Sequence, residues 1–148
     1  MIKPIEIIKN RSDIGAGTRG ADLGIDAIEI AAINKGSDFF IRYSHKNVKT
    51  RNNSVYNPLE HRFAKLIPHI YMQCKEVASV VEHCLNNNSF PLVFSGDHSS
   101  AIGTITGVNE AYKDSKLGVI WIDAHADIHS PYTTPSGNMH GMPLAALM

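Results

Sequence analysis

The sequence has 148 residues, 43% hydrophobic and 19% charged, which excludes a disordered tail or a collagen-like repeat. Its 14 basic residues (Lys and Arg) equal its 14 acidic ones, whereas a dedicated nucleic-acid-binding protein normally carries a basic excess. No apolar run approaches the roughly 18–20 residues of a membrane span, and Pro4 and Glu6 interrupt the region where a signal peptide needs an apolar core. We therefore expect one cytoplasmic domain over residues 1–148, with no nucleic-acid or membrane partner.

In the first part of the chain, apolar periodicity and clusters of turn residues predict two strands and two helices. Alternating apolar residues indicate strands, whereas apolar residues spaced i, i+3, i+4 and i+7 indicate helices. The expected elements are a strand over 4–9, a glycine-rich loop over 15–20, a helix over 21–34, a strand over 38–43, a polar surface loop over 44–58 and a long helix over 61–85.

The second part of the chain has a different pattern, with two short, continuously apolar runs at 91–94 and 117–122. A helix is expected between them, over 99–113, where Gly103 and Gly107 allow close packing. Continuously apolar strands separated by helices are typical of a parallel sheet covered on both faces. The sequence therefore predicts an α/β fold.

The two cysteines, Cys74 and Cys84, lie ten residues apart in the predicted long helix. That spacing corresponds to about 15 Å along a helix, which is too far for a disulfide. Both are therefore expected to be small buried core residues. Four of the eight histidines are expected on the surface or on helix faces, without a ligand role: His45, His61, His69 and His83.

Residues of metal-ligand type follow both apolar runs directly. His98 comes after the first run, and Asp123, His125 and Asp127 come after the second. The carboxyl ends of parallel strands meet at one edge of a sheet, and positions 123, 125 and 127 point the same way in an extended segment. Mixed nitrogen and oxygen ligands suit Mn, Fe, Co or Zn better than Ca. The sequence therefore predicts a metal site at this edge.

Further along the chain, a polar loop offers groups that suit a small polar substrate. Thr133, Thr134, Ser136 and Asn138 supply neutral hydrogen-bonding groups. His140 follows closely, and an imidazole is a natural proton carrier because its unperturbed pKa lies near neutrality.

Three segments, 95–99 (SGDHS), 123–127 (DAHAD) and 136–141 (SGNMHG), together resemble the ureohydrolase family, and arginases in particular. The resemblance implies a three-layer α/β/α fold with a mainly parallel sheet, and a chain that is the N-terminal part of one such domain. It also implies a binuclear manganese centre, with Co, Fe or Zn as other candidates. A hydroxide bridging the two metals would attack the guanidinium carbon of L-arginine, giving L-ornithine and urea. In full-length form such a protein is expected to be a homo-oligomer.

The resemblance also assigns roles to individual residues. His98 and Asp127 correspond to ligands of one metal, His125 to a ligand of the other, and Asp123 to a bridging ligand. His140 corresponds to the proton shuttle and, with Asp127, forms the expected catalytic pair. The residues expected to bind the substrate, mainly at its α-amino-acid end, are His129, Thr134, Ser136, Gly137 and Asn138. A loop that holds the substrate carboxylate favours arginase over agmatinase, because decarboxylated arginine, the agmatinase substrate, has no carboxylate.

The sequence departs from the family pattern at three points. Ser95 stands where the family usually has glycine, and His129 stands where arginases usually have an asparagine that contacts the substrate carboxylate. Family members are roughly twice as long, and their second half supplies two more aspartate ligands in a D-x-D motif that this sequence lacks. We therefore expect the 148-residue chain alone to have an incomplete active site.

Three alternatives stay open at this point. His129 leaves room for an agmatinase-type or formiminoglutamase-type hydrolase that acts on another guanidino or formimino substrate. Gly15, Gly17 and Gly20 match the spacing of the dinucleotide fingerprint, with Asp38 at about the distance of its acidic residue. A chain of this length is also compatible with an inactive remnant that binds metal or supports oligomerisation.

Overall fold

The central strand of the sheet is β1 (Ile5–Asn10), close to the predicted range. In the computed structural model, which describes residues 3–148, β1 pairs in parallel with β2 (Ser44–Asn47) on one side and β3 (Phe90–Ser95) on the other. All three strands therefore end at the same edge of the sheet, which is where open α/β folds place their ligands.

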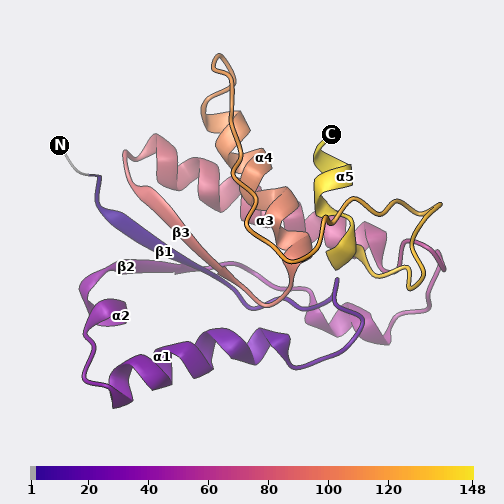
Figure 1. Cartoon of the computed structure of the whole chain (residues 1–148). Helices are drawn as coiled ribbons and strands as arrows, with labels where there is room; N and C mark the ends of the chain where they lie inside the picture. The colour runs from indigo at the N-terminus through magenta and orange to yellow at the C-terminus, as the bar shows by residue number, and fades with distance from the viewer. Residues whose placement is uncertain (1–2) are drawn as a thin grey trace.

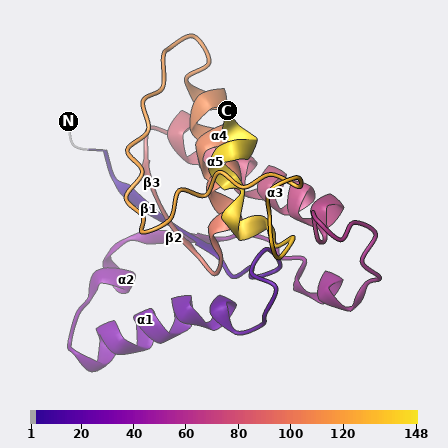
Figure 2. The ribbon, with the colours of Figure 1, turned by 45° about the vertical axis from the view of Figure 1, so that its right-hand side comes forward.

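Helices cover both faces of this sheet, so the predicted α/β fold with a parallel sheet is confirmed (Figures 1 and 2). The side chains of β1 alternate between the faces: Ile8 belongs to a core cluster with Val77 and Val81, whereas Lys9 pairs with Glu29 on the other side. The 3-10 helix η1 (Ala21–Leu23) leads into α1 (Gly24–Asn34) on one face, and α3 (Ile67–Asn86) and α4 (Ala101–Ala111) lie on the other.

The helices α3 and α4 pack closely because α4 presents two glycines to α3. A Cβ atom on Gly103 would lie 2.5 Å from the carbonyl oxygen of Cys74, and one on Gly107 would lie 2.5 Å from that of Ala78. The expectation for the cysteines is also confirmed, since Cys74 and Cys84 are free thiols inside the core on α3. Burial raises the pKa of Cys74 to about 11 and that of Cys84 to about 12, which makes both thiols unreactive.

The prediction of a strand over 38–43 is wrong, because these residues form the short helix α2 (Phe39–Arg42). Contacts between residues four apart stabilise the turn. Arg42 Nη2 lies 2.7 Å from Asp38 Oδ2, and the rings of Phe39 and Tyr43 meet edge to face at 5.2 Å. Such pairs meet on a helix and not on a strand, so these local contacts outweigh the β-propensity of the aromatic residues.

The polar stretch 44–58 is not purely a loop, contrary to expectation. It contains β2, whose residues are all exposed, and the 3-10 helix η2 (Asn52–Tyr56). The register of β2 pairs Glu6 with Ser44 and Lys9 with Asn47. Because backbone hydrogen bonds stabilise this edge strand without burying its side chains, it has no apolar signal in the sequence.

The long helix begins six residues later than predicted, at Ile67 instead of His61. Leu66 takes a left-handed conformation (φ 55°), and Pro68 occupies the first turn of α3. Proline has no N–H group and is tolerated only at the start of a helix, so it sets this boundary. In the described residues 3–148, no helix is long and apolar enough to cross a membrane.

Residues 117–122, predicted to be a buried strand, are extended but join no sheet. Leu117 and Val119 line a surface pocket beside α4, whereas Ile120 and Ile122 are 89% and 93% exposed. A continuously apolar strand is stable in a parallel sheet when both of its faces are covered. Ile120 and Ile122 have no such cover among residues 3–148, and the segment does not pair with β3.

Candidate metal centre

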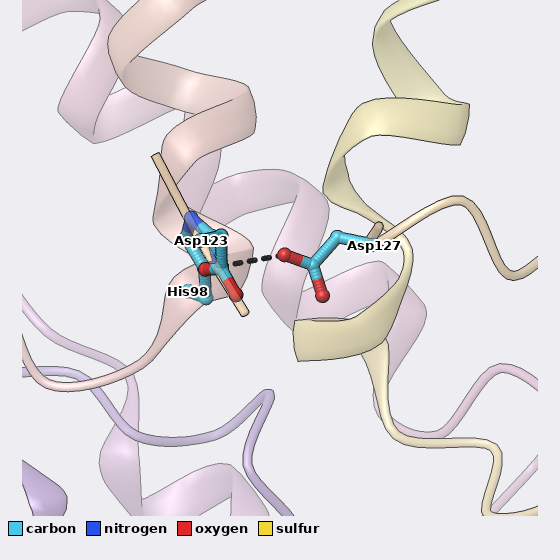
Figure 3. A group of neighbouring side chains, drawn as sticks. All are labelled: His98, Asp123 and Asp127. Atoms are coloured by element: carbon cyan, nitrogen blue, oxygen red, sulfur yellow. Dashed lines mark ion pairs between the residues drawn. The ribbon is translucent and has the colours of Figure 1, made fainter. Parts of the chain in front are cut away.

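Three of the four predicted metal ligands meet beyond the end of β3 (Figure 3). His98 is the first residue of the 3-10 helix η3 (His98–Ser100), which follows β3 closely. Its Nδ1 lies 3.2 Å from Asp123 Oδ2 and 3.0 Å from Asp127 Oδ2. The two carboxylates arrive from the segment after residue 122, so the predicted convergence of the two strand ends is observed even though that segment forms no strand.

The carboxylate of Asp127 has the features expected of a cation ligand. Its side chain is 8% exposed, and among residues 3–148 no hydrogen-bond donor reaches Oδ2 with acceptable geometry. His98 Nδ1 is near enough, but its angle to this oxygen is not that of a hydrogen bond. A buried carboxylate oxygen without a donor is unfavourable. Since the ligand atoms of His98, Asp123 and Asp127 all lie within 4.8 Å of one another, these residues fit a divalent metal.

The backbone at Asp127 is strained and is held in place by the helix that follows. Asp127 has a φ of 50°, in the left-handed region that non-glycine residues rarely adopt. Its carbonyl oxygen accepts a hydrogen bond of 3.0 Å from the backbone N–H of Leu144, at the start of α5 (Pro143–Leu147). This hydrogen bond fixes the direction in which the Asp127 carboxylate leaves the backbone.

The carboxylate of Asp123 is pre-set in its charged form. Its Oδ1 accepts a 2.7 Å hydrogen bond from the backbone N–H of His125, and this bond is the main reason that the pKa of Asp123 lies below 3.8. The side chains of His125 and His98 lower the pKa further, while desolvation opposes them. Asp123 therefore offers a charged oxygen to the cluster near neutral pH.

His125, the fourth predicted ligand, lies outside the cluster. Its side chain is 83% exposed, and its Nδ1 lies 3.3 Å from Asp123 Oδ1. The structure thus places His125 at the rim, next to the carboxylate assigned a bridging role. Its predicted part in holding a second metal stays a prediction.

Two neighbours of the cluster were not anticipated from the sequence. The indole of Trp121, the only tryptophan in the chain, stacks on the imidazole of His98 with 4.8 Å between ring centroids and 26° between planes. Asp97 accepts hydrogen bonds from the backbone N–H groups of Ser99 (2.8 Å) and Gly15 (3.1 Å), so it caps η3 and ties it to the glycine-rich loop. Residues 121 and 123 point the same way in an extended segment, so the sequence could have indicated that Trp121 lies beside the cluster.

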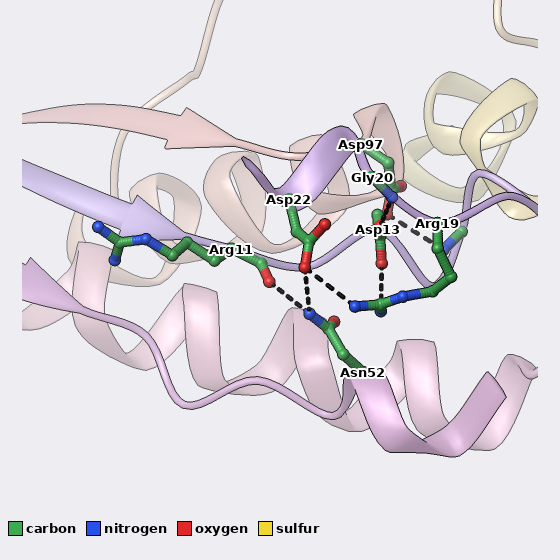
Figure 4. Close-up of polar contacts among 8 residues, drawn as sticks. Arg11, Asp13, Arg19, Gly20, Asp22, Asn52 and Asp97 are labelled. Carbon is green, nitrogen blue, oxygen red and sulfur yellow. Dashed lines mark hydrogen bonds and ion pairs between the residues drawn. The ribbon is translucent and has the colours of Figure 1, made fainter. Parts of the chain in front are cut away.

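The glycine-rich loop 15–20 does not form a dinucleotide site, so that alternative is wrong. A carboxylate already occupies each of the two amides that would face a phosphate: Asp97 binds the N–H of Gly15, and Asp13 binds the N–H of Gly20 at 2.8 Å (Figure 4). Asp13 is fully buried and also pairs with Arg19 at 2.6 Å. Acidic groups at these positions would repel a pyrophosphate.

The predicted substrate residues lie together on one loop. Thr134 is buried, and its hydroxyl accepts the N–H of Gly137 at 2.9 Å. Ser136 Oγ accepts the N–H of Asn138 at 3.2 Å, and the Asn138 amide donates to the carbonyl oxygen of Ala16 at 3.2 Å. A pocket of about 430 Å³ is lined by His125, Asp127, His129, Thr134, Ser136, Asn138 and His140, among others. The predicted substrate loop therefore shares this pocket with Asp127, one of the three residues of the metal cluster.

His140 is oriented by the glycine-rich loop. Its Nδ1 lies 2.9 Å from the carbonyl oxygen of Gly15. A carbonyl only accepts, so Nδ1 carries the proton and Nε2 is the nitrogen left for chemistry. The other histidines behave as expected, since His45, His61 and His83 are exposed, and His69 is half-buried on α3.

Arginases are among the solved structures with the same architecture. The chain superposes on arginase from Bacillus caldovelox with a TM-score of 0.77 at 35% identity, covering 97% of this chain and 48% of that one. It superposes on Entamoeba histolytica arginase, solved with L-ornithine, with a TM-score of 0.80 at 26% identity and the same coverage. The fold is thus that of arginases, as the resemblance implied.

Sequence comparison gives the same result at the level of the family. The chain belongs to the arginase family, whose family model matches residues 3–148. It is 38% identical to an arginase from Brevibacillus brevis over 151 aligned positions and 37% identical to one from Bacillus subtilis over 147. These alignments cover 99% and 98% of the chain but 48% of each relative, so the chain spans about half the length of the curated relatives it matches.

Proposed function

We propose that this chain supplies the N-terminal part of a metal-dependent arginase site, which hydrolyses the guanidinium group of L-arginine to L-ornithine and urea. The observation that carries the proposal is the buried, unpartnered oxygen of Asp127 beside His98 and Asp123. We further propose that the protein acts in the cytoplasm and, in full-length form, as a homo-oligomer.

The residues have distinct roles in this proposal. His98 and Asp127 would hold one Mn²⁺, His125 would contact a second, and Asp123 would lie between the two. When bound, the metal pair supplies a water molecule of lowered pKa as the nucleophile. The carboxylates of Asp123 and Asp127 would compensate the metal charge, and Asp127 also lines the pocket of the substrate loop.

The substrate loop would hold the α-amino-acid end of arginine. The hydroxyl of Ser136 and the amide of Asn138 lie in the pocket, and the buried hydrogen bond from Gly137 to Thr134 keeps the loop rigid. L-ornithine bound to the Entamoeba histolytica arginase has this same amino-acid end. His140 would carry a proton on Nε2, because its Nδ1 is committed to Gly15.

The second candidate is an agmatinase-type or formiminoglutamase-type reaction, and His129 in the pocket is the observation that favours it. Titration of the chain with L-ornithine and with 1,4-diaminobutane, which lacks the carboxylate, distinguishes arginase from agmatinase. For an arginase we expect shifts in the amide NMR signals of Ser136 and Asn138 with L-ornithine only. Equal shifts with both ligands would favour an agmatinase-type site.

Manganese binding tests the metal centre directly. Free Mn²⁺ measured by electron paramagnetic resonance gives the Kd of the chain, and His98→Ala or Asp127→Asn should raise this Kd at least about tenfold. His83→Ala removes an exposed histidine on α3 and serves as the control, with an unchanged Kd. A wild-type Kd that neither ligand substitution changes would refute the metal centre.

The incomplete ligand set makes a separate prediction about activity. Two metals of five or six coordination need about ten donor positions, and the four proposed side chains cannot fill them. We expect the purified 148-residue chain with Mn²⁺ to release no urea from L-arginine above background. Robust urea release would show that the ligands present here are sufficient.

A further inference from the structure

The hydroxyl of Ser95 lies at the end of β3, three residues before His98. Its Oγ accepts a hydrogen bond from Asn10 Nδ2 at 3.0 Å and donates one to the carbonyl oxygen of Asp97 at 3.1 Å. Ser100 Oγ contacts Ser95 Oγ and lies 2.9 Å from the same carbonyl. Because this carbonyl belongs to the planar peptide group that leads into His98, the two hydroxyls set the direction from which the His98 side chain projects.

The partner of Ser95 on β1 is itself held rigidly. Asn10 is fully buried, and its Oδ1 accepts a 2.9 Å hydrogen bond from the amide of Gln73 on α3. Gln73 is 3% exposed and also donates to the carbonyl oxygen of Lys49 at 3.1 Å. The amide nitrogen of Gln73 thus donates to two acceptors, and this pair of hydrogen bonds holds the buried amides of Gln73 and Asn10 in place. A continuous hydrogen-bonded chain thus runs from α3 through β1 to Ser95.

The same short loop is held from other directions by Asp97, whose carboxylate binds two backbone amides, and by Trp121, which stacks on His98. Neither of these contacts fixes the Asp97 carbonyl, which depends on Ser95 and Ser100. A glycine at position 95, as the family usually has, offers no hydroxyl for this purpose.

We propose that Ser95 is a positioning residue for the metal centre: its hydroxyl links the buried Asn10 amide to the Asp97 carbonyl and so holds His98 in its ligating orientation. This inference rests on the proposed metal function of His98. The hydrogen bonds of Ser95 go to Asn10, Asp97 and Ser100 and not to a proposed metal ligand or the substrate loop, so its effect is on metal affinity through His98.

Three variants of the 148-residue chain test the proposal by Mn²⁺ titration, with free Mn²⁺ followed by electron paramagnetic resonance and Trp121 emission as a second signal. Ser95→Ala should raise the Kd about three- to tenfold, the range expected for losing the hydrogen bond that holds the Asp97 carbonyl. Ser95→Thr keeps the hydroxyl at an exposed position and should bind like wild type. Ser44→Ala, an exposed serine on β2, is the matched control.

The outcomes separate positioning from simple stability. An unchanged Kd for Ser95→Ala overturns the proposal, whether or not its Tm falls. A Ser95→Thr protein that binds as weakly as Ser95→Ala also overturns it, because the hydroxyl would then not be the group that matters. If wild type and His98→Ala bind Mn²⁺ equally well, the metal centre itself is refuted, which is distinct from a failure confined to Ser95.

Discussion

At the residue scale, Gly137 shows how tightly the substrate loop is built. It has a φ of 76°, and a Cβ atom there would collide with the carbonyl oxygen of Arg62. Its own carbonyl oxygen accepts a 2.9 Å hydrogen bond from the N–H of Lys65, so the loop rests on the segment before α3. Glycine is required here both by the backbone conformation and by the closeness of the neighbouring chain.

Gly137→Ala should lower the free energy of unfolding by about 2–3 kcal/mol, from the left-handed backbone and the steric contact together. Gly36→Ala is the matched control, since Gly36 has a φ of 71° but open space around it. We expect about 1 kcal/mol for that variant. Urea denaturation measures both values, and equal losses would show that the contact with Arg62 relaxes without cost.

The residues that form the site could be predicted from the sequence, but the directions of their side chains could not. Position after an apolar run and a period of two indicated where His98, Asp123 and Asp127 would meet, because these are local properties of extended chains. The outward direction of His125 depends on the backbone after Asp123, and the strain at Asp127 depends on α5, which follows later in the chain. Neither feature has a local signal.

At the element scale, a partly buried ion pair attaches α1 to the sheet. Lys9 on β1 is 3% exposed, and its Nζ lies 2.6 Å from Glu29 Oε2 on α1 and 5.4 Å from the centre of the Phe40 ring on α2. A buried ammonium needs a charged partner. The pair therefore determines how α1 docks, because only one position of the helix brings Glu29 to Lys9.

Glu29→Gln should lower the free energy of unfolding by about 1–2 kcal/mol, since it leaves Lys9 buried without its counter-charge. The expected loss is smaller than for a fully buried ion pair, because Glu29 is 27% exposed and water screens its charge. Asp38→Asn, which breaks the exposed pair with Arg42, should lower the free energy of unfolding by clearly less than Glu29→Gln does. Chemical denaturation of the two variants compares them, and a larger loss for Asp38→Asn would contradict this ranking.

A second contact attaches α1 to the end of β1 and makes a prediction about acid stability. The hydrogen bond from Arg11, at 2.6 Å between Nη2 and Oδ1, holds the pKa of Asp26 below 3.8. Because the folded pKa is depressed, the stabilisation is present above the unfolded value of about 3.9 and is lost as the pH falls through the folded pKa. In Arg11→Met, an NMR titration should find the pKa of Asp26 raised toward 3.8. If the pKa of Asp26 is unchanged in this variant, a group other than Arg11 lowers it.

Elements could be predicted where one face packs against the core, and less well elsewhere. β1, β3 and α4 lie close to their predicted ranges because each packs apolar residues against the core, whereas α1 was found from its apolar residues although only Ile25 of them is buried. The edge strand β2 has only backbone pairing, and α2 depends on contacts between residues four apart, so periodicity does not detect either. The unpaired segment 117–122 shows the reverse case, an apolar pattern without a surface to cover it.

At the scale of the whole molecule, large apolar side chains remain at the surface. Besides Ile120 and Ile122, these include Leu23, Ile30, Ile33 and Ile41 around α1 and α2. Exposed apolar patches of this kind favour association or aggregation. In Figures 1 and 2 the segment after α4 runs along the outside of the molecule, so its isoleucines are accessible.

The double variant Ile120→Lys with Ile122→Lys should reduce self-association of the chain without lowering its Tm. Both side chains are about nine-tenths exposed, so their replacement removes little packing. Sedimentation velocity over a range of concentrations measures the association, and thermal unfolding measures the Tm. Increased monomer together with a clearly lower Tm would instead mean that these isoleucines contribute to the fold.

Asp127 is the point at which ligand binding and folding become thermodynamically linked. Its carboxylate faces His98, while its carbonyl oxygen receives the first N–H groups of α5. An ion that fixes the carboxylate also fixes the strained backbone, and the docked helix in turn prepares the carboxylate for the ion. By reciprocity each event favours the other. Saturating metal at 100 times its Kd would add about 2.7 kcal/mol to the folded state, so α5, which supplies no metal ligand of its own, would report whether the site is occupied.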